Sequence, residues 1–305
     1  GALVTPSSLT VTGDLITTTS GTSNFVAGVN AGNSIASGGN YNVAVGDEAG
    51  TAITTGDDNV AIGYAALDAL SSGSRSVAIG SGALTALTAT GNAYNTAVGY
   101  LAGTAATTGI RNNFFGAEAG EALTEGTDNI AIGYQTLTAD TLGSRSVAIG
   151  NNALDAQNFT SATNTYNTAV GYAAGGAVTT GRFNTLIGGL AGFTETGGSY
   201  STGVGYGALY SQNANGDAHN TAIGYTAGLN VTTGNKNTLI GALAGDALST
   251  GSSNSVLGYK ALSADTLGSR AVAIGDQALE NQNFTSGTDN YNIGIGYKAG
   301  NAIST

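Results

Sequence analysis

Hydrophobic and polar positions alternate in one short pattern that returns fifteen times along the chain. The pattern is Asn-x-Ala-Ile/Val-Gly, as in Asn59–Gly63, Asn129–Gly133 and Asn220–Gly224. The residue before the glycine is apolar in every copy, and the residue two places earlier is mostly Val, Ile or Thr. Side chains alternate along a strand, so these two positions share one face, and the alanine and glycine share the other. The pattern predicts a strand of about four or five residues, flanked by turns of Gly, Asn, Ser and Thr.

The spacing of the copies predicts a solenoid. The motif glycines lie at positions 46, 63, 80, 99, 116, 133, 150, 171, 188, 205, 224, 241, 258, 275 and 296, and a degenerate copy ends at Gly28. From Gly46 the intervals are 17, 17, 19, 17, 17, 17 and 21, and the same seven then repeat, so Gly46, Gly171 and Gly296 are equivalent positions of a superrepeat. A short period held over nearly the whole chain is typical of stacked coils. Stacked strands lie about 4.8 Å apart, so sixteen coils predict a rod about 75 Å long.

The repeats divide the chain into four segments. We expect an N-terminal connecting β segment at 1–23, a first solenoid block at 24–171, a second block at 172–296, and the start of a further coil at 297–305. The common interval is too short for a helix, a strand and two loops, so each coil should hold two very short strands and two turns.

The two faces of the strand suggest how coils pack. We expect the larger apolar side chains to fill the core, and the alanine and glycine face to allow another chain to approach closely. A coil this thin would expose apolar surface if it were alone. We therefore expect three chains to associate about the long axis, with the alanine and glycine face towards the neighbours.

The opening position of the motif is Asn in eleven copies, including Asn59, Asn129 and Asn220, whose copies close with Gly63, Gly133 and Gly224. The exceptions are Ser76, Ser146, Ser201 and Ala271. We interpret these Asn and Gly residues as structural, with each Asn side chain bonded to its own turn or to the next coil. A ladder of metal ions, the alternative, would need Asp or Glu at this position.

Composition and charge exclude several classes of function. The chain has 19 acidic and 8 basic residues, a formal net charge of −11, and no cysteine. Such a surface repels nucleic acid, and no apolar run is long enough for a spanning helix, so we expect neither nucleic-acid binding nor membrane insertion. Without cysteine there is no disulfide framework and no thiolate metal site. The repeat shows no converging polar groups, so we expect no enzymatic activity, cofactor or metal.

A few side chains are candidates for surface contacts. Tyrosine follows the motif glycine in eight copies, and a column of tyrosines could pack chains together or bind a carbohydrate or protein. The longest intervals carry Phe159 and Phe284, which could dock a partner or cap a bulge. His219 occupies a position held elsewhere by tyrosine, which suits stacking. Three arginines recur in Gly-Ser-Arg, and we expect ion pairs with Asp140 or Asp265, either within one chain or between chains. The contact candidates are Phe159, Phe284, Tyr64, Tyr134, Tyr225 and Tyr259.

These motifs resemble two groups of proteins. Ser76-Val77-Ala78-Ile79-Gly80 and Ser146-Val147-Ala148-Ile149-Gly150 are similar to the coils in the left-handed parallel β-roll heads of trimeric autotransporter adhesins. The longer unit at 220–237 resembles repeat arrays of phage tail fibres, and residues 9–15 resemble segments that join modules in such fibres. The resemblance covers roughly residues 24–305. It implies an all-β, left-handed β-solenoid that assembles as an elongated homotrimer outside a cell or on a virion.

We therefore expect a structural shaft segment of a viral or phage tail fibre. Its partners would be its own copies, other virion or fibre components, and a glycan or protein of the host surface. One alternative is the head of a bacterial trimeric surface adhesin. A lesser alternative is an ice-binding solenoid, although its Thr-Thr-Gly pairs at 54, 107, 179 and 232 are sparse for a flat array of threonines.

Overall fold

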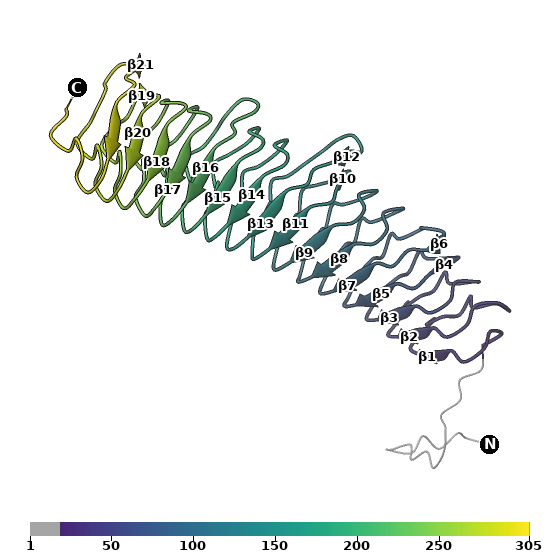
Figure 1. Cartoon of the computed structure of the whole chain (residues 1–305). Coiled ribbons are helices and arrows are strands. Elements are labelled where there is room, and N and C mark those ends of the chain that lie inside the picture. The colour runs from purple at the N-terminus through teal and green to yellow at the C-terminus, as the bar shows by residue number, and fades with distance from the viewer. Residues whose placement is uncertain (1–18, 305) are drawn as a thin grey trace, which may run out of the picture.

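The computed structural model describes residues 19–304 and shows a parallel β-solenoid (Figure 1). Within this range every regular element is a strand, which confirms the predicted all-β fold. One sheet of sixteen strands runs the length of the rod. Its strands, in spatial order, are β1 (Phe25–Ala27), β2 (Val43–Val45), β3 (Val60–Ile62), β5 (Val77–Ile79), β7 (Thr96–Val98), β8 (Asn113–Phe115), β9 (Ile130–Ile132), β11 (Val147–Ile149), β13 (Thr168–Val170), β14 (Thr185–Ile187), β15 (Thr202–Val204), β16 (Thr221–Ile223), β17 (Thr238–Ile240), β18 (Ser255–Leu257), β20 (Val272–Ile274) and β22 (Ile293–Ile295). The predicted connecting segment, 1–23, lies mostly outside the described residues.

The motif residues pair in strict register from coil to coil. Val60 pairs with Val77, Ala61 with Ala78 and Ile62 with Ile79. The register is kept across the longer intervals too, since β5 pairs with β7 and β11 with β13 through equivalent motif positions. The additional residues of these four longer coils, which we call the long coils, are therefore placed away from the main sheet.

The long coils form a second, shorter ladder. Three of them carry two-residue parallel pairs, and the fourth has a single bridge between Ser199 and Asp217. The pairs are β4 (Gly73–Ser74) with β6 (Gly91–Asn92), β10 (Gly143–Ser144) with β12 (Thr163–Asn164), and β19 (Gly268–Ser269) with β21 (Thr288–Asp289). A second strand in each coil was predicted, but among the described residues it forms only at these places.

The core lies behind the middle residue of each strand. Ala61, Ala78 and Ala131 are fully buried, whereas the flanking Ile62, Ile79 and Ile132 are 36 to 38% exposed. The prediction that the larger apolar side chains fill the core is therefore wrong, and so is the expectation that the alanine side faces another chain. The interior is narrow, and alanines and leucines from the opposite turn already occupy it. Only a small side chain fits there from most strands.

Residue sizes across this narrow core are complementary. Phe114 in β8 is the largest fully buried side chain, and the opposite wall carries Gly103 and Gly120 beside it. A Cβ added at Gly120 would clash with the Phe114 ring. In the coils of Ala61 and Ala78 the opposite wall instead carries the buried leucines Leu67 and Leu84. A volume gained on one wall is removed from the other, as close packing requires.

The motif glycines stack on one another. A Cβ on Gly63 would lie 2.7 Å from the carbonyl carbon of Gly80, and a Cβ on Gly80 would lie 2.6 Å from the carbonyl carbon of Gly99. Gly63 also has a φ of +126°, a conformation that side chains rarely adopt. The close approach that glycine permits is therefore made by the next coil of the same chain.

Candidate interaction surfaces

The motif asparagines form a buried amide ladder. The backbone N–H of Asn59 donates to Oδ1 of Asn42 at 3.0 Å, and its Nδ2 donates to the carbonyl of Gly73 at 2.9 Å. Asn129 makes equivalent bonds, and Asn220 bonds the next N–H and a turn carbonyl in the same way. Each side chain thus pairs one coil with the next while it satisfies a turn carbonyl, which confirms the structural interpretation of these residues.

The ladder is interrupted before each long coil. Ser76, Ser146, Ser201 and Ala271 are the four exceptions to Asn, and each belongs to the motif copy that directly precedes a long coil. In a regular pair, Oδ1 of one Asn accepts the N–H of the next. Across a long coil the chain takes another path: the N–H of Asn167 is bonded to Thr165 Oγ1 and that of Asn292 to Asn290 Oδ1. The Oδ1 of an Asn before a long coil would therefore have no backbone N–H of the next motif copy to accept from.

A buried glutamine and a buried acid replace the missing amide in three of the four long coils. Gln157 donates from Nε2 to Oδ2 of Asp140 at 2.6 Å and to Oγ of Ser146 at 2.8 Å, and its Oε1 accepts from Nδ2 of Asn167 at 2.8 Å. Burial raises the pKa of Asp140, and hydrogen bonds from Gln157 and from backbone amides oppose this. The same arrangement recurs as Glu195 with Gln212 and as Asp265 with Gln282. We call these the acid–glutamine pairs.

The remaining long coil, which follows Ser76, has apolar side chains at these positions. Leu70 and Leu87 are fully buried at the positions equivalent, one superrepeat earlier, to Glu195 and Gln212. A polar pair and an apolar pair therefore occupy the same place in one solenoid. The fold requires that the site be filled, and it tolerates either chemistry.

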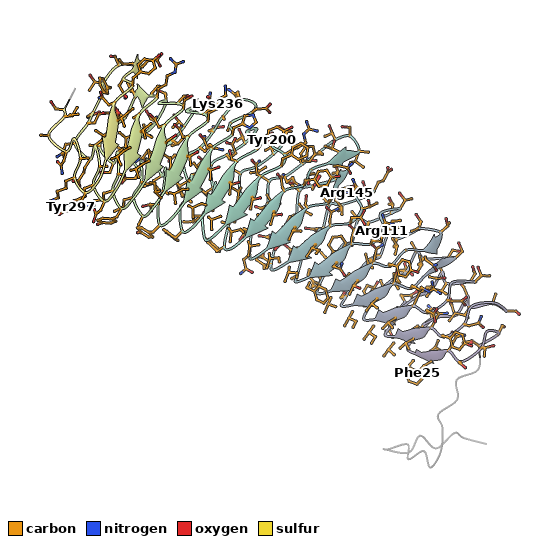
Figure 2. All side chains as sticks on the ribbon, in the orientation of Figure 1. Phe25, Arg111, Arg145, Tyr200, Lys236 and Tyr297 are labelled. Carbon is orange, nitrogen blue, oxygen red and sulfur yellow. The ribbon has the colours of Figure 1, made fainter. Side chains whose placement is uncertain are left out.

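An outer column of residues precedes the motif asparagines, with a left-handed backbone at every copy. Its arginines pair with exposed acids: Arg75 with Asp58 at 3.6 Å and Arg145 with Asp128 at 4.0 Å. Arg270 pairs with Asp289. The expected partners, Asp140 and Asp265, are instead buried in the acid–glutamine pairs, so that prediction is wrong. Figure 2 shows Arg111, Arg145, Tyr200 and Lys236 of this column along one edge of the rod.

The same column contains a stack of aromatic rings. Phe183 lies between Tyr166 and Tyr200 with ring centroids 5.6 and 4.9 Å away, and His219 follows Tyr200 at 5.1 Å. The predicted stacking role of His219 is confirmed. Rings stacked along the axis cover most of one another's faces. This column therefore stabilises the coils and offers mainly ring edges to solvent.

The candidate tyrosines after the motif glycine are exposed. Tyr64, Tyr134, Tyr225 and Tyr259 have 47 to 62% of their surface accessible. Phe159, by contrast, is 7% exposed, and its backbone N–H donates to Oδ1 of Asp140. Of the two roles considered for Phe159, docking a partner or capping a bulge, its burial supports the second. Phe284 has the equivalent bond to Asp265.

Two grooves lie on the turn that follows the motif glycine. The larger, of about 480 Å³, is lined by Asn152, Asp155, Tyr172 and Phe193 among others. The second, of about 410 Å³, includes Tyr206, Tyr210, Ser211 and Asn230. Both grooves are formed by equivalent turns of successive coils between positions 150 and 230. The repeat pattern did not single out this concentration of aromatic side chains, although the run of aromatic residues from Tyr172 to Tyr225 is visible in the sequence.

Comparisons with family models, curated proteins and solved structures find no match. Within residues 19–304 no three His, Cys, Asp or Glu side chains gather as metal ligands would, and no helix could cross a membrane. Three features are therefore candidates for interaction or for a special structural role: the exposed apolar side chains on the outer face of the sheet, the acid–glutamine pairs, and the grooves.

Proposed function

We propose that this chain is a structural shaft segment of an elongated homotrimeric fibre, on a viral or phage tail or on another external surface. The outer face of the sixteen-stranded sheet carries the argument. Along this face, which we call the apolar stripe, Ile62, Ile79, Ile132 and Ile223 are each 36 to 39% exposed. None of the side chains flanking the strand centres is charged, from Phe25 to Ile295. A long apolar patch of this kind is typical of an interface.

Self-association suits this stripe because the chain is acidic elsewhere. Copies with a net charge of −11 repel one another over most of their surface, and the stripe is the uncharged region where they can meet. The sheet that carries the stripe runs the length of the rod (Figure 1), so parallel copies can pack along their whole length. Three copies around a common axis would cover it on each chain. In this arrangement the common axis lies at the apolar stripe and not at the expected alanine side, which is buried within each chain.

Solution mass tests the proposal. Sedimentation of the chain should give about three times 29.7 kDa, and Ile132→Asp with Ile149→Asp should lower the mass to one chain. Thr180→Asp, which adds a charge at an exposed turn, is the matched control and should leave the mass unchanged. A monomeric native chain would contradict the homotrimer.

The alternatives have less support. A bacterial trimeric adhesin head would use the same stripe, and a full-length gene with a C-terminal coiled coil and membrane anchor would favour it. An ice-binding role needs free threonine hydroxyls. Thr107, Thr179 and Thr232 instead donate to carbonyls of the next coil at 3.0 to 3.2 Å.

A further inference from the structure

The grooves on the turn face depart from the superrepeat. Phe193, Tyr206 and Tyr210 correspond, one superrepeat earlier, to Asp68, Ser81 and Thr85. The first block folds into the same coils with these small polar residues. Stacking of the coils therefore does not demand the aromatic side chains, which makes them candidates for a role other than coil stacking.

The rings form two short stacks, and each ends beside a glycine. Phe193 stacks on Tyr210 with centroids 5.4 Å apart, and Tyr206 stacks on Tyr225 at 5.8 Å. A Cβ on Gly176 would lie 3.3 Å from the Phe193 ring. One on Gly189 would likewise lie 3.5 Å from the Tyr206 ring. Because glycine has no side chain, it leaves the end of each stack uncovered, unlike the continuous column that contains Phe183.

Polar groups lie between these rings. Asn152 and Asp155 line the first groove beside Tyr172, which is 64% exposed, and Ser211 and Asn230 line the second. Burial raises the pKa of Asp155, so the groove already withdraws this carboxyl from water. Aromatic faces with hydrogen-bonding groups at their rims match a ligand that has C–H faces and hydroxyl edges.

We infer that the two grooves form one binding site for a neutral oligosaccharide, which lies along the rod between positions 150 and 230. Sugar rings would pack on the open faces of Phe193, Tyr206 and Tyr172, while Asp155, Asn152 and Asn230 accept or donate hydrogen bonds at the hydroxyls. The acidic carboxyl and the net charge of −11 disfavour anionic sugars. The inference rests on the proposed function, since an external fibre meets surface glycans.

Titration with defined sugars tests the site. The probes are maltohexaose, cellohexaose, mannohexaose and chitohexaose, with a heparin hexasaccharide as the anionic comparison, observed by saturation-transfer NMR and calorimetry on the assembled native protein. At least one neutral probe should bind, and heparin should bind at least tenfold more weakly. Phe193→Asp with Tyr210→Thr installs the residues of the first block, so it should fold normally and lose at least tenfold in affinity.

The matched control is Tyr64→Ser, which removes an exposed tyrosine of the same turn position outside the grooves and should bind like the native chain. The site is refuted if no neutral probe binds, if heparin binds better, or if the double variant keeps its affinity. The mass of each sample separates the two proposals. A trimer that binds no sugar overturns the site alone, and a monomer that binds overturns the trimer alone.

Discussion

Gln157 donates a hydrogen bond of 2.6 Å to the carboxylate of Asp140, and both side chains are fully buried. This contact bridges two coils where the asparagine ladder is interrupted. In the earlier long coil of the first block, Leu70 and Leu87 occupy the same positions. The molecule thus contains its own control for replacing a buried polar pair by an apolar one.

Asp140→Leu alone should destabilise the neighbouring coils by about 2–4 kcal/mol, because Gln157 and the N–H groups of Gly143 and Phe159 lose their acceptor. Adding Gln157→Leu should recover part of this loss, since the double variant imitates Leu70 and Leu87. Hydrogen exchange of the amides in residues 140–160 measures the local stability. A double variant less stable than Asp140→Leu would contradict the idea that the two sites are interchangeable.

Asn129→Ala should cost about 2–4 kcal/mol, because it leaves the N–H of Ser146 and the carbonyl of Gly143 without partners in the interior. The reverse change, Ala271→Asn, should give no stabilisation, because the long coil that follows takes the next N–H elsewhere. Thermal unfolding of both variants checks the pair. Equal effects of opposite sign would show that any Asn stabilises the ladder, whatever the length of the next coil.

Gly63→Ala should disrupt stacking far more than Gly216→Ala. Both glycines have a φ that side chains rarely adopt, +126° and +111°, so both substitutions carry a conformational cost. A Cβ on Gly63 meets the backbone of Gly80 at 2.7 Å, whereas one on Gly216 has nothing within 4 Å. We expect a loss of about 1 kcal/mol at Gly216 from strain alone and several times that at Gly63. Similar losses at the two positions, measured by thermal unfolding, would mean that backbone angle rather than contact requires glycine.

The ion pair of Arg111 and Asp128 should make a small pH-dependent contribution to stability. The hydrogen bond from Arg111 lowers the pKa of Asp128, so the stabilisation is present above the unfolded pKa of about 3.9 and is lost as the pH falls through the folded pKa. Arg111→Ala should raise the Asp128 pKa, which NMR titration of the carboxyl can follow. The difference in melting temperature between variant and native chain should shrink as the pH falls through the folded pKa. A constant difference at all pH values would assign the effect to packing.

The repeat predicted the coil, its register and its asparagine ladder, because these depend on residues with one acceptable chemistry. Gly63 leaves no room for a side chain. The asparagine at position 59 bonds both a turn carbonyl and the next N–H through one short amide side chain. The alternation of side chains along the strand predicted its two faces, but it did not predict which of the two faces is buried. That depends on Leu67 and its equivalents filling the narrow core from the opposite wall, a contact that no local pattern shows.

The grooves and the acid–glutamine pairs were harder to foresee. Asp140 and Gln157 belong to successive coils and look like ordinary turn residues until one coil is placed on the next. A signal existed in Ser146, because its departure from Asn coincides with the longer interval that follows. In the sequence, Tyr206 and Tyr210 look like part of a column or like isolated residues, since their common groove arises only from the turn that folds them together.

The strict register of the sheet across both short and long coils makes the length of this rod an adjustable quantity. Seven coils form one superrepeat unit, and each unit extends the rod by about 34 Å at a strand spacing of about 4.8 Å. Because each coil contacts only its neighbours, duplication or loss of a whole unit joins surfaces that already match. Duplication or loss of a unit by recombination within the gene would therefore change the length of the rod while the stacking of neighbouring coils is kept.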